Sequence, residues 1–519
     1  MNNLRHLGIA LLIIGVLSSS FAQPTIQWQK TFGGSNYDEG QMVRQTSDGG
    51  YVLAGTSAST NGDVFGNHGG GDFWILKLNA MGSIQWKKLF GGSQNDILED
   101  IQQLPDGGFA VVGWTASNDF DVTGQHGETD GWVIRLNEQG SLLWQKAIGG
   151  SLKDYFTRVA LTPDNGFVIS GYSTSNDGDV SWNNGDIDFW LVKLDSTGTK
   201  QWDRSLGGSH QELARCVISC TEGGYIAVGE TYSTDGDVSS NFGSCDYWVV
   251  KLHANGELEW QQTYGGEGGD TPKEIIESSD GGYIVIGHSG SNNSGQVFGH
   301  KDLGFENYWV IKISSSGELE WQRPLGGSEQ DWGESVVQMQ DGAFIVAGYA
   351  RSDNGDVSDP ISDQNVWLVK LSPSGDKIWD VNFGGTLQDN CYSVIQTNDG
   401  GIAFGGFTRS NDGDLTGLPF HGGADFWVVK LASETTGTAD LDQADNFVLS
   451  PIPAISYFQL EGDEGVLTLY NMQGQIVLQQ TTQPEETIEI NYLQPGMYLA
   501  RLQKSGSNKQ KWSKLLITR

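Results

Sequence analysis

A Gly-Gly pair recurs at a nearly fixed interval, and this period constrains the fold more than any other feature of the chain. The first glycine of each pair is Gly33, Gly91, Gly149, Gly207, Gly265, Gly326 or Gly384, so the steps are 58, 58, 58, 58, 61 and 58 residues. A short insertion in the fifth repeat accounts for the longer step. Seven copies of such a unit, built from short β-type runs, are typical of a β-propeller or another β-array.

Each repeat contains four β-type runs, which we name A, B, C and D. In the first repeat they cover residues 26–32, 39–46, 51–56 and 72–78. The Asp-Gly turn between runs B and C is a strong hairpin signal, because glycine tolerates the positive φ of tight turns. A second short turn joins run D to the next run A. We therefore expect each blade to consist of runs B, C, D and the following A.

This phasing has a consequence at the two ends of the repeat region. The chain begins with an A run that has no partner, and its last D run, residues 426–431, has no A run after it. We predict that residues 27–32 pair with residues 426–431, which removes the open sheet edges. The predicted fold is all-β: a seven-bladed β-propeller over residues 23–432, with the ring closed by the N-terminal strand.

The same phasing places the long C–D loops and the Gly-Gly crossovers on one face. Long and variable loops carry function more often than the elements that they connect, so this face is the expected functional surface. Lys+Arg 30 against Asp+Glu 64 gives a net charge of −34, which argues against binding nucleic acid or an anionic membrane. Neutral glycans, cations or basic proteins fit this charge better.

The N-terminus has the pattern of a secretion signal. Arg5 precedes an apolar run over residues 7–17, and Ser20 and Ala22 are small residues at a cleavage site after Ala22. We expect a signal peptide over residues 1–22 and no membrane span in the mature chain.

The four cysteines are Cys216, Cys220, Cys245 and Cys391. Cys216 and Cys220 stand ~13 Å apart on one strand at ~3.3 Å per residue, too far to bridge. Free buried thiols are favoured, and a bridge from Cys245 to one of them is the alternative.

Acidic residues recur at three positions of the repeat: at the start of run B, within the C–D loop and at the start of run D. Close groups such as Asp177-Gly178-Asp179 suggest Ca²⁺ as a cofactor, since a hard cation needs several oxygen ligands. The alternative is that these side chains cap turns, and recurrence in nearly every blade favours this structural role. The candidate metal ligands are Asp63, Asp121, Asp177, Asp179, Asp237, Asp356 and Asp414.

Two positions vary between the blades and are not dictated by the fold. The end of run C supplies Trp114, Tyr172, His288 and Tyr349, and the position after the B-run acid supplies Tyr155 and Trp332. Aromatic side chains beside carboxylates bind sugars by stacking and hydrogen bonding, so these six are the candidate ligand-binding residues. Packing between blades is the alternative, above all for the run C set. No catalytic motif is present, and no carboxylate pair stands out for glycoside hydrolysis.

After residue 432 the period stops. Residues 433–445 form a polar linker, and residues 446–519 have the pattern of a small β-sandwich domain with short strands over 447–449, 465–471, 475–480, 487–490, 497–502 and 511–517.

Several ordered motifs in this tail resemble the type A C-terminal sorting domain of the type IX secretion system. The matching stretches are residues 449–453, 469–475, 493–498 and 514–517, with Ile452 where the family usually has Asn. The motif residues are Pro451, Pro453, Gly474, Pro495, Gly496 and Tyr498. The resemblance implies the type IX machinery as a partner, passage through the outer membrane, and removal of the tail with release or attachment at the cell surface.

The repeats resemble secreted seven-bladed propeller repeats with Asp-Gly-Gly-Tyr and Asp-x-Trp-x-x-Lys-Leu cores, which stand here at residues 48–51 and 72–78. Proteins of this kind are sometimes labelled endoglucanases, but no catalytic residue carries over. We interpret the chain as a secreted or surface binding and adhesion module for a carbohydrate or a protein. The alternatives are a glycan-degrading enzyme or its accessory, and a structural surface protein without a small ligand.

Overall fold

The structure is a computed structural model that describes two compact parts of the chain, each considered by itself. It describes residues 23–433 apart from 300–304 and 360–362, and residues 448–517 apart from 451–455, 462–463, 472–475, 484–485 and 505–509. The predicted signal peptide, residues 1–22, and residues 434–445 of the predicted linker lie outside the described residues.

Residues 23–433 form seven four-stranded antiparallel sheets. The first contains β2 (Asp38–Gln45), β3 (Tyr51–Ser57), β4 (Asp72–Leu78) and β5 (Ile84–Phe90), in that order. The next five repeat this order as β6 (Asp96–Gln103), β7 (Phe109–Thr115), β8 (Asp130–Leu136) and β9 (Leu142–Ile148); β10 (Asp154–Leu161), β11 (Phe167–Ser173), β12 (Asp188–Leu194) and β13 (Lys200–Leu206); β14 (Glu212–Ser219), β15 (Tyr225–Thr231), β16 (Asp246–Leu252) and β17 (Leu258–Tyr264); β18 (Asp270–Glu277), β19 (Tyr283–Ser289), β20 (Asn307–Ile313) and β21 (Leu319–Leu325); and β22 (Asp331–Gln338), β23 (Phe344–Ala350), β24 (Asn365–Leu371) and β25 (Lys377–Phe383).

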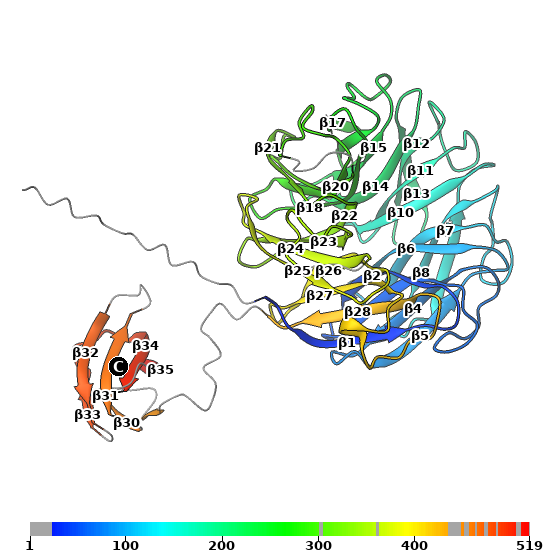
Figure 1. The fold of residues 1–519 in the computed structure, drawn as a ribbon. Coiled ribbons are helices and arrows are strands. Elements are labelled where there is room, and N and C mark those ends of the chain that lie inside the picture. The colour runs from blue at the N-terminus through cyan, green and yellow to red at the C-terminus, as the bar shows by residue number, and fades with distance from the viewer. Residues whose placement is uncertain are drawn as a thin grey trace, which may run out of the picture. The chain divides into compact units, whose positions relative to one another are not determined.

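The seventh sheet joins the two ends of the repeat region. It contains β26 (Asp389–Gln396), β27 (Ile402–Thr408) and β28 (Asp425–Leu431), and β1 (Ile26–Phe32) is its fourth strand (Figure 1). A short 3-10 helix, Gly413–Leu415, lies between β27 and β28. In the register of β1 with β28, Ile26 faces Leu431 and Phe32 faces Phe426. The pairing of residues 27–32 with residues 426–431 is therefore confirmed.

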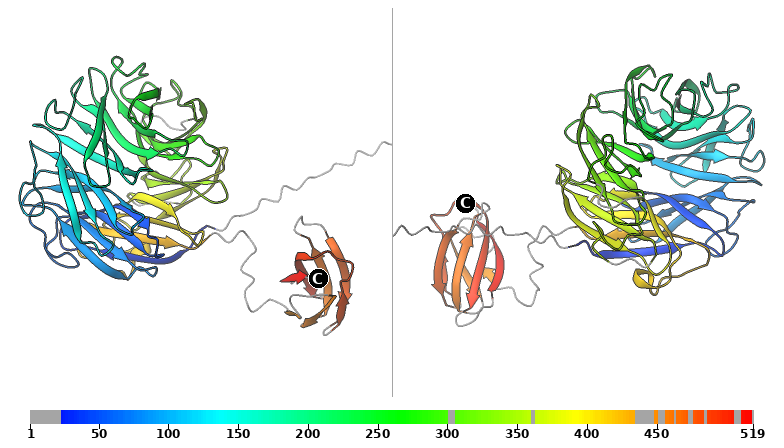
Figure 2. Two further views of the ribbon diagram at one scale, coloured as in Figure 1. Left: turned by 180° about the vertical axis from the view of Figure 1, so that it is seen from behind. Right: turned by 45° about the horizontal axis from the view of Figure 1, so that its top comes forward.

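The first strand of each sheet lies innermost. These strands contact one another in the order β2, β6, β10, β14, β18, β22 and β26, and β26 also contacts β2. Figures 1 and 2 show the sheets side by side around this central group of strands. The architecture is thus an all-β, propeller-like array of repeated four-stranded sheets.

Packing within the array explains the Asp-Gly-Gly and Trp-x-x-Lys motifs. The tryptophan of the third strand of each sheet is almost completely buried between sheets, as in Trp74 and Trp132. The residue three positions later is a buried lysine in six sheets and the buried Arg135 in the second. Lys77 Nζ lies 2.8 Å from Oδ2 of Asp48 in the B–C turn. Burying such an indole contributes several kcal/mol, and the ion pair satisfies the buried ammonium group. All four cysteines are buried and free, as favoured from the sequence.

The Gly-Gly loop crosses the seam between two neighbouring sheets. At the seam between the first and second sheets, Gly92 N donates a hydrogen bond of 2.6 Å to Oδ2 of Asp96. A Cβ at Gly91 would collide with carboxyl oxygens of both Asp72 and Asp96. This close approach of backbone to carboxyl groups requires glycine and explains the motif that defines the repeat.

The tail forms two sheets with a shared core. One contains β29 (Val448–Ser450), β30 (Tyr457–Glu461) and β33 (Thr487–Glu489); the other contains β31 (Gly465–Tyr470), β32 (Ile476–Thr482), β34 (Gly496–Lys504) and β35 (Gln510–Ile517). Phe458 and Ile488 from the first pack with Leu467 and Leu515 from the second. The sequence prediction had no strand at residues 457–461 and was wrong there, because that run is short and lies beside proline-rich sequence. No helix among the described residues is long and apolar enough to cross a membrane.

Five of the seven seams also hold a buried acid with one oxygen that has no partner among the described residues. Asp72 Oδ2 accepts the His68 amide at 2.8 Å, whereas its buried Oδ1 has no partner among the described residues. The same holds for Oδ1 of Asp130, Asp188, Asp246 and Asp425. Asn365 occupies this position in the sixth sheet. In the orientation that satisfies its amide, its nitrogen donates to the carbonyl oxygens of Gly385 and Gln364 at 3.2 and 3.1 Å. A donor is therefore preferred at this position, as a protonated carboxyl group would be.

We predict that these seams make stability fall as pH rises. Burial raises the pKa of Asp72 to about 7, so the native state keeps a proton that the unfolded chain releases near pH 4. The free energy of unfolding therefore falls as pH rises from about 4 to about 7, and the loss is complete above about pH 7. Asp72→Asn should raise stability at pH 8 by about 1–3 kcal/mol and flatten the dependence of the melting temperature on pH.

The matched control is Asn307→Asp, which puts an acid at a seam where the native chain has an amide. This variant should lose stability at that seam as pH rises. Equal pH dependence in the native chain and in both variants, measured by thermal melts from pH 5 to pH 8, would show that these acids do not retain a proton.

Candidate functional site

Seven β-bulges bring seven side chains of six kinds to the centre of the array. The register between the first and second strand of every sheet shifts after the third residue of the first strand. The unpaired residues are Gln41, Glu99, Thr157, Arg215, Lys273, Glu334 and Tyr392. Bulges re-aim side chains and are common beside functional sites.

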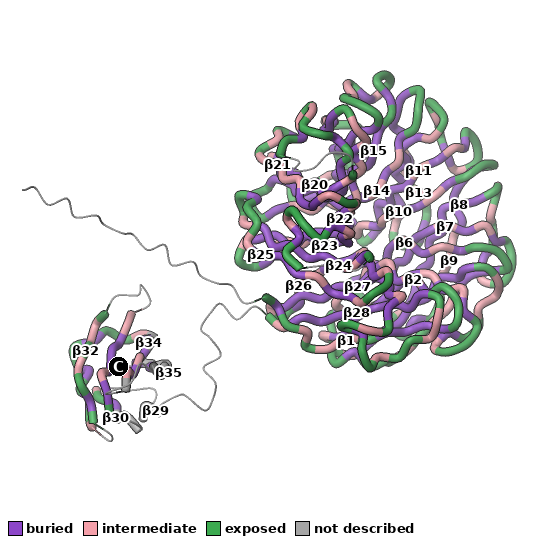
Figure 3. The backbone as a smooth tube through the Cα atoms, viewed as in Figure 1, coloured by how far each residue is buried: buried purple, intermediate pink, exposed green. Residues whose placement is uncertain are grey.

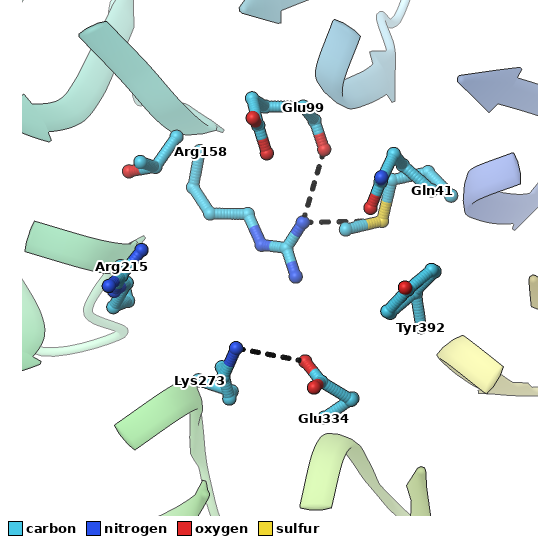
Figure 4. A pocket seen from close by; sticks show the side chains of 9 residues that line it. Gln41, Glu99, Arg158, Arg215, Lys273, Glu334 and Tyr392 are labelled. Atoms are coloured by element: carbon cyan, nitrogen blue, oxygen red, sulfur yellow. Dashed lines mark hydrogen bonds and ion pairs between the residues drawn. The ribbon is translucent and has the colours of Figure 1, made fainter. Parts of the chain in front are cut away.

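These bulge residues surround one pocket of about 180 Å³ (Figure 4). Its lining consists of the seven bulge residues together with Met42 and Arg158, the residues that follow two of the bulges. All seven innermost strands thus contribute to one site. Its walls are mostly polar or charged, so it suits a small polar ligand with several hydrogen-bonding groups.

The charged side chains of the pocket are unequally paired. Arg215 forms a two-pronged ion pair with Glu230, with nitrogen to oxygen distances of 2.7 and 3.2 Å. Lys273 Nζ lies 3.5 Å from Oε2 of Glu334. Arg158 instead extends into the pocket, as Figure 4 shows, and its Nη1 donates to Glu99 O at 3.3 Å.

Burial changes the acid strength of the pocket carboxyl groups. It raises the pKa of Glu99 to about 7, although the nearby Arg158 and Arg215 oppose the shift. It also raises the pKa of Glu334 and of Glu39, whose Oε1 accepts a hydrogen bond of 2.9 Å from the Tyr392 hydroxyl. A group that titrates near neutral pH makes the charge of this site sensitive to pH.

The six aromatic residues singled out from the sequence gather in two groups. Tyr155 stacks on Tyr172 with ring centroids 4.8 Å apart and meets Trp114 edge-on at 5.4 Å. Trp332 lies between His288 and Tyr349, at 4.4 and 5.6 Å.

The two groups pack between neighbouring sheets, as the alternative interpretation expected for the run C set. His288 and Tyr349 are buried, and burial lowers the pKa of His288 so that it is neutral. Tyr155 and Trp332 are half-buried, and Lys273 Nζ lies 5.7 Å from the centroid of the Trp332 ring. Trp332 therefore borders the pocket.

The loop acids proposed as metal ligands contact the Gly-Gly loops. Asp179 Oδ2 accepts the Gly149 amide at 3.4 Å, and the Asp179 amide donates to Gly149 O at 2.9 Å. Asp177 Oδ1 accepts the Ser151 amide at 2.7 Å. The same contact to the loop glycine is made by Asp63, Asp121, Asp237, Asp356 and Asp414. Among the described residues, no three His, Cys, Asp or Glu side chains converge as a metal site.

Sequence reasoning missed the bulge residues, which are the main lining of the pocket. Within run B this position changes from Gln41 to Glu99, Arg215 and Lys273, but the positions on either side of it vary as well, so the sequence alone does not single it out. Sequence reasoning also missed a set of exposed aromatic side chains in the C–D loops. The set includes Phe65, Phe120, Trp182, Phe242, Phe298, Phe305 and Phe420. Figure 3 shows in green that many loop residues of the array are exposed.

The C-terminal tail carries the evidence on the location of the protein. Residues 449–518 match the family described as the secretion system C-terminal sorting domain. The tail is a type IX sorting domain. Of its predicted motif residues, Tyr498 donates a hydrogen bond of 2.8 Å to Gln494 O and Pro495 and Gly496 precede it, whereas Pro451, Pro453 and Gly474 lie outside the described residues. The protein is therefore secreted or placed on the outer cell surface, and its tail implies the type IX machinery as a partner.

Other comparisons give more distant similarities. Regulatory protein FlaEY of Caulobacter vibrioides is 23% identical over 273 residues, which are 47% of this chain and 28% of that protein. The extracellular domain of the putative hybrid two-component system BT4673 from B. thetaiotaomicron is 12% identical, with a TM-score of 0.39 over 93% of this chain and 57% of that one. PorZ, a surface component of the type IX secretion system of Porphyromonas gingivalis, is 10% identical, with a TM-score of 0.28 over 91% and 69%.

We predict that the loop acids stabilise the fold with or without calcium. Asp179→Ala removes an acceptor for the Gly149 amide and should cost about 1 kcal/mol of stability. The melting temperature of the variant should lie below that of the native chain, and this difference should be the same in calcium and in chelator. A calcium-dependent rise in melting temperature that disappears in Asp179→Ala would instead make this residue a metal ligand.

Proposed function

We propose that the seven sheets close into a seven-bladed β-propeller and that the protein binds a saccharide outside the cell through the pocket at its centre. The observation that carries the proposal is the convergence on that pocket of seven bulge side chains of six different kinds. Residues that merely maintain the repeat recur from blade to blade, whereas these differ in charge, size and hydrogen-bonding capacity.

The chemistry of the pocket supports a polyhydroxylated ligand. Gln41 and Thr157 both donate and accept hydrogen bonds, Arg158 and Lys273 only donate, and ionised Glu334 only accepts. Alternating donors and acceptors match the hydroxyl groups of a sugar ring. Trp332, at the border of the pocket, stacks on His288 with ring centroids 4.4 Å apart and lies 5.7 Å from Lys273 Nζ, so its ring helps to position that cation.

The location of the protein outside the cell supports an adhesion or capture role. Its sorting tail directs it to the cell exterior, where saccharides are presented as polymers and surface layers. The net charge of −34 disfavours tight contact with polyanionic surfaces through bulk electrostatics, so recognition depends on the local site.

A glycan-degrading enzyme is the second candidate, and one observation favours it. Glu99, whose burial raises its pKa to about 7, shares the pocket with Glu334. A carboxyl group that keeps its proton near neutral pH can act as the general acid of glycoside hydrolysis, with a second carboxylate opposite.

We predict that saccharide binding depends on the pocket. On a glycan array, the double variant Gln41→Ala/Trp332→Ala should bind at least about 10-fold more weakly than the native chain, since it loses the hydrogen bonds of Gln41 and the ring that positions Lys273. The control is Phe65→Ala/Phe120→Ala, which changes exposed loop aromatics. A loss confined to the control would place the site on the loops, and no binding to any saccharide would refute the proposal.

Reducing ends should be assayed on the same samples. Release of product that stops in Glu99→Gln would establish the hydrolase. Binding without product would support the binding module.

The closed ring is tested through β1. A chain that begins at residue 33 lacks this strand and exposes the edge of β28. Compared with a chain that begins at residue 23, it should melt at a lower temperature and associate into oligomers, because an open edge pairs with other chains. Unchanged melting and a monomeric elution profile would contradict closure by β1.

A further inference from the structure

The pocket contains an arc of three cations on consecutive inner strands. Arg158 lies on β10, Arg215 on β14 and Lys273 on β18 (Figure 4). A chain with 30 basic and 64 acidic residues gathers these cations at one point of its interior. Burying cations is costly unless each of them has a partner.

Two of the three cations have one. Glu230 holds Arg215 through both of its carboxylate oxygens, and Glu334 lies beside Lys273. Arg158 has no ion pair among the described residues. Its Nη1 contacts only Glu99 O at 3.3 Å and Met42 Sδ at 3.5 Å, and its buried Nε has no hydrogen-bond partner there.

The two carboxylates that contribute most to the favourable field at Arg158 are engaged elsewhere. Asp100 lies 3.2 Å from Arg44 through Oδ1 and accepts the Val159 amide at 3.1 Å through Oδ2. Glu274 Oε2 accepts the Ser335 hydroxyl at 2.7 Å and the Val336 amide at 2.8 Å. They contribute a favourable field at Arg158 but not a direct hydrogen-bonded partner. The guanidinium therefore has donors to spare, and Figure 4 shows it directed into the pocket.

The group that fits spare guanidinium donors is a planar acceptor with two oxygens. A carboxylate forms parallel hydrogen bonds with the guanidinium fork, which a single hydroxyl group does not. The volume of about 180 Å³ is below the roughly 300–1,000 Å³ of pockets for drug-sized ligands, so it suits one ring and not an extended chain.

We propose that the pocket binds a uronic acid residue of an acidic saccharide, with the ligand carboxylate paired to Arg158. The inference rests on the proposed function of the pocket as a saccharide site and adds the class of sugar. Arg215 and Lys273 flank the carboxylate, while Gln41, Thr157 and Tyr392 contact the ring hydroxyl groups.

Binding should strengthen as pH falls from 8 to 6. The single charged and titratable groups around Arg158 are Glu99, Glu39, Tyr392, Asp100 and Glu274. Two ion pairs also lie around it, Arg215 with Glu230 and Lys273 with Glu334. Glu99 has its pKa raised to about 7 by burial, so it becomes neutral over this range and ceases to repel the ligand. Affinity for a uronate should rise several-fold, whereas affinity for a neutral sugar should not change in step.

The test is calorimetry of the full chain with galacturonate and glucuronate against galactose and glucose. We expect the uronates to bind at least about 10-fold more tightly than the neutral sugars, and Arg158→Gln to abolish this difference. Arg158→Lys, which keeps the charge but loses the fork, should retain part of it. Lys153→Gln, an exposed lysine in a loop, makes the same change of charge and should have no effect.

The outcomes separate this inference from the proposed function. Equal binding of neutral sugars and uronates, or uronate binding unchanged in folded Arg158→Gln, would overturn the inference and leave the saccharide site standing. If neither neutral sugars nor uronates bind, both this inference and the proposed saccharide site are refuted. Thermal melts of each variant show that the comparison is between folded proteins.

Discussion

The contact of each Gly-Gly loop with an acid of the next sheet and with an Asp or Asn of the preceding sheet is the constraint on which the rest of the repeat region depends. At the first seam, Gly92 donates to Asp96, and Gly91 leaves the space that the carboxyl groups of Asp72 and Asp96 occupy. The contact ties the last strand of one sheet to the first strand of the next. Because it recurs at every seam, all inner strands begin at the same depth, and their bulges come to lie around one pocket.

This arrangement separates the residues that hold the fold from those that are free to differ. The seam acids, the buried tryptophans and the lysine to turn-acid pairs recur because each sheet repeats the same packing problem. The bulge residue meets no such demand, since it has no cross-strand partner and faces the centre. A pocket built from seven such positions can change its chemistry without changing the scaffold.

The electrostatics of the protein differ between its surface and its centre. The chain carries a net charge of −34, yet the pocket places Arg158, Arg215 and Lys273 among carboxyl groups whose pKa is raised by burial. Surface charge keeps an exported protein soluble and disfavours non-specific binding to polyanions. The buried cations act only over short distances, so they select a ligand that enters the pocket and do not attract polymers over long range.

The sequence alone determined the period, the four strands of each repeat, the pairing of β1 with β28 and the sorting tail, because glycine turns, alternating runs and short motifs are local signals. It also singled out Tyr155 and Trp332 as candidate ligand-binding residues. It missed β30, which is short, and the seven bulge residues that line the pocket. A bulge is an offset of register between two strands, so Thr157 or Arg215 is unpaired only once both strands are aligned. Which cations are paired was likewise decided by tertiary structure, because the partner of Lys273 comes from the next sheet, 61 residues away, and Arg158 is left without one.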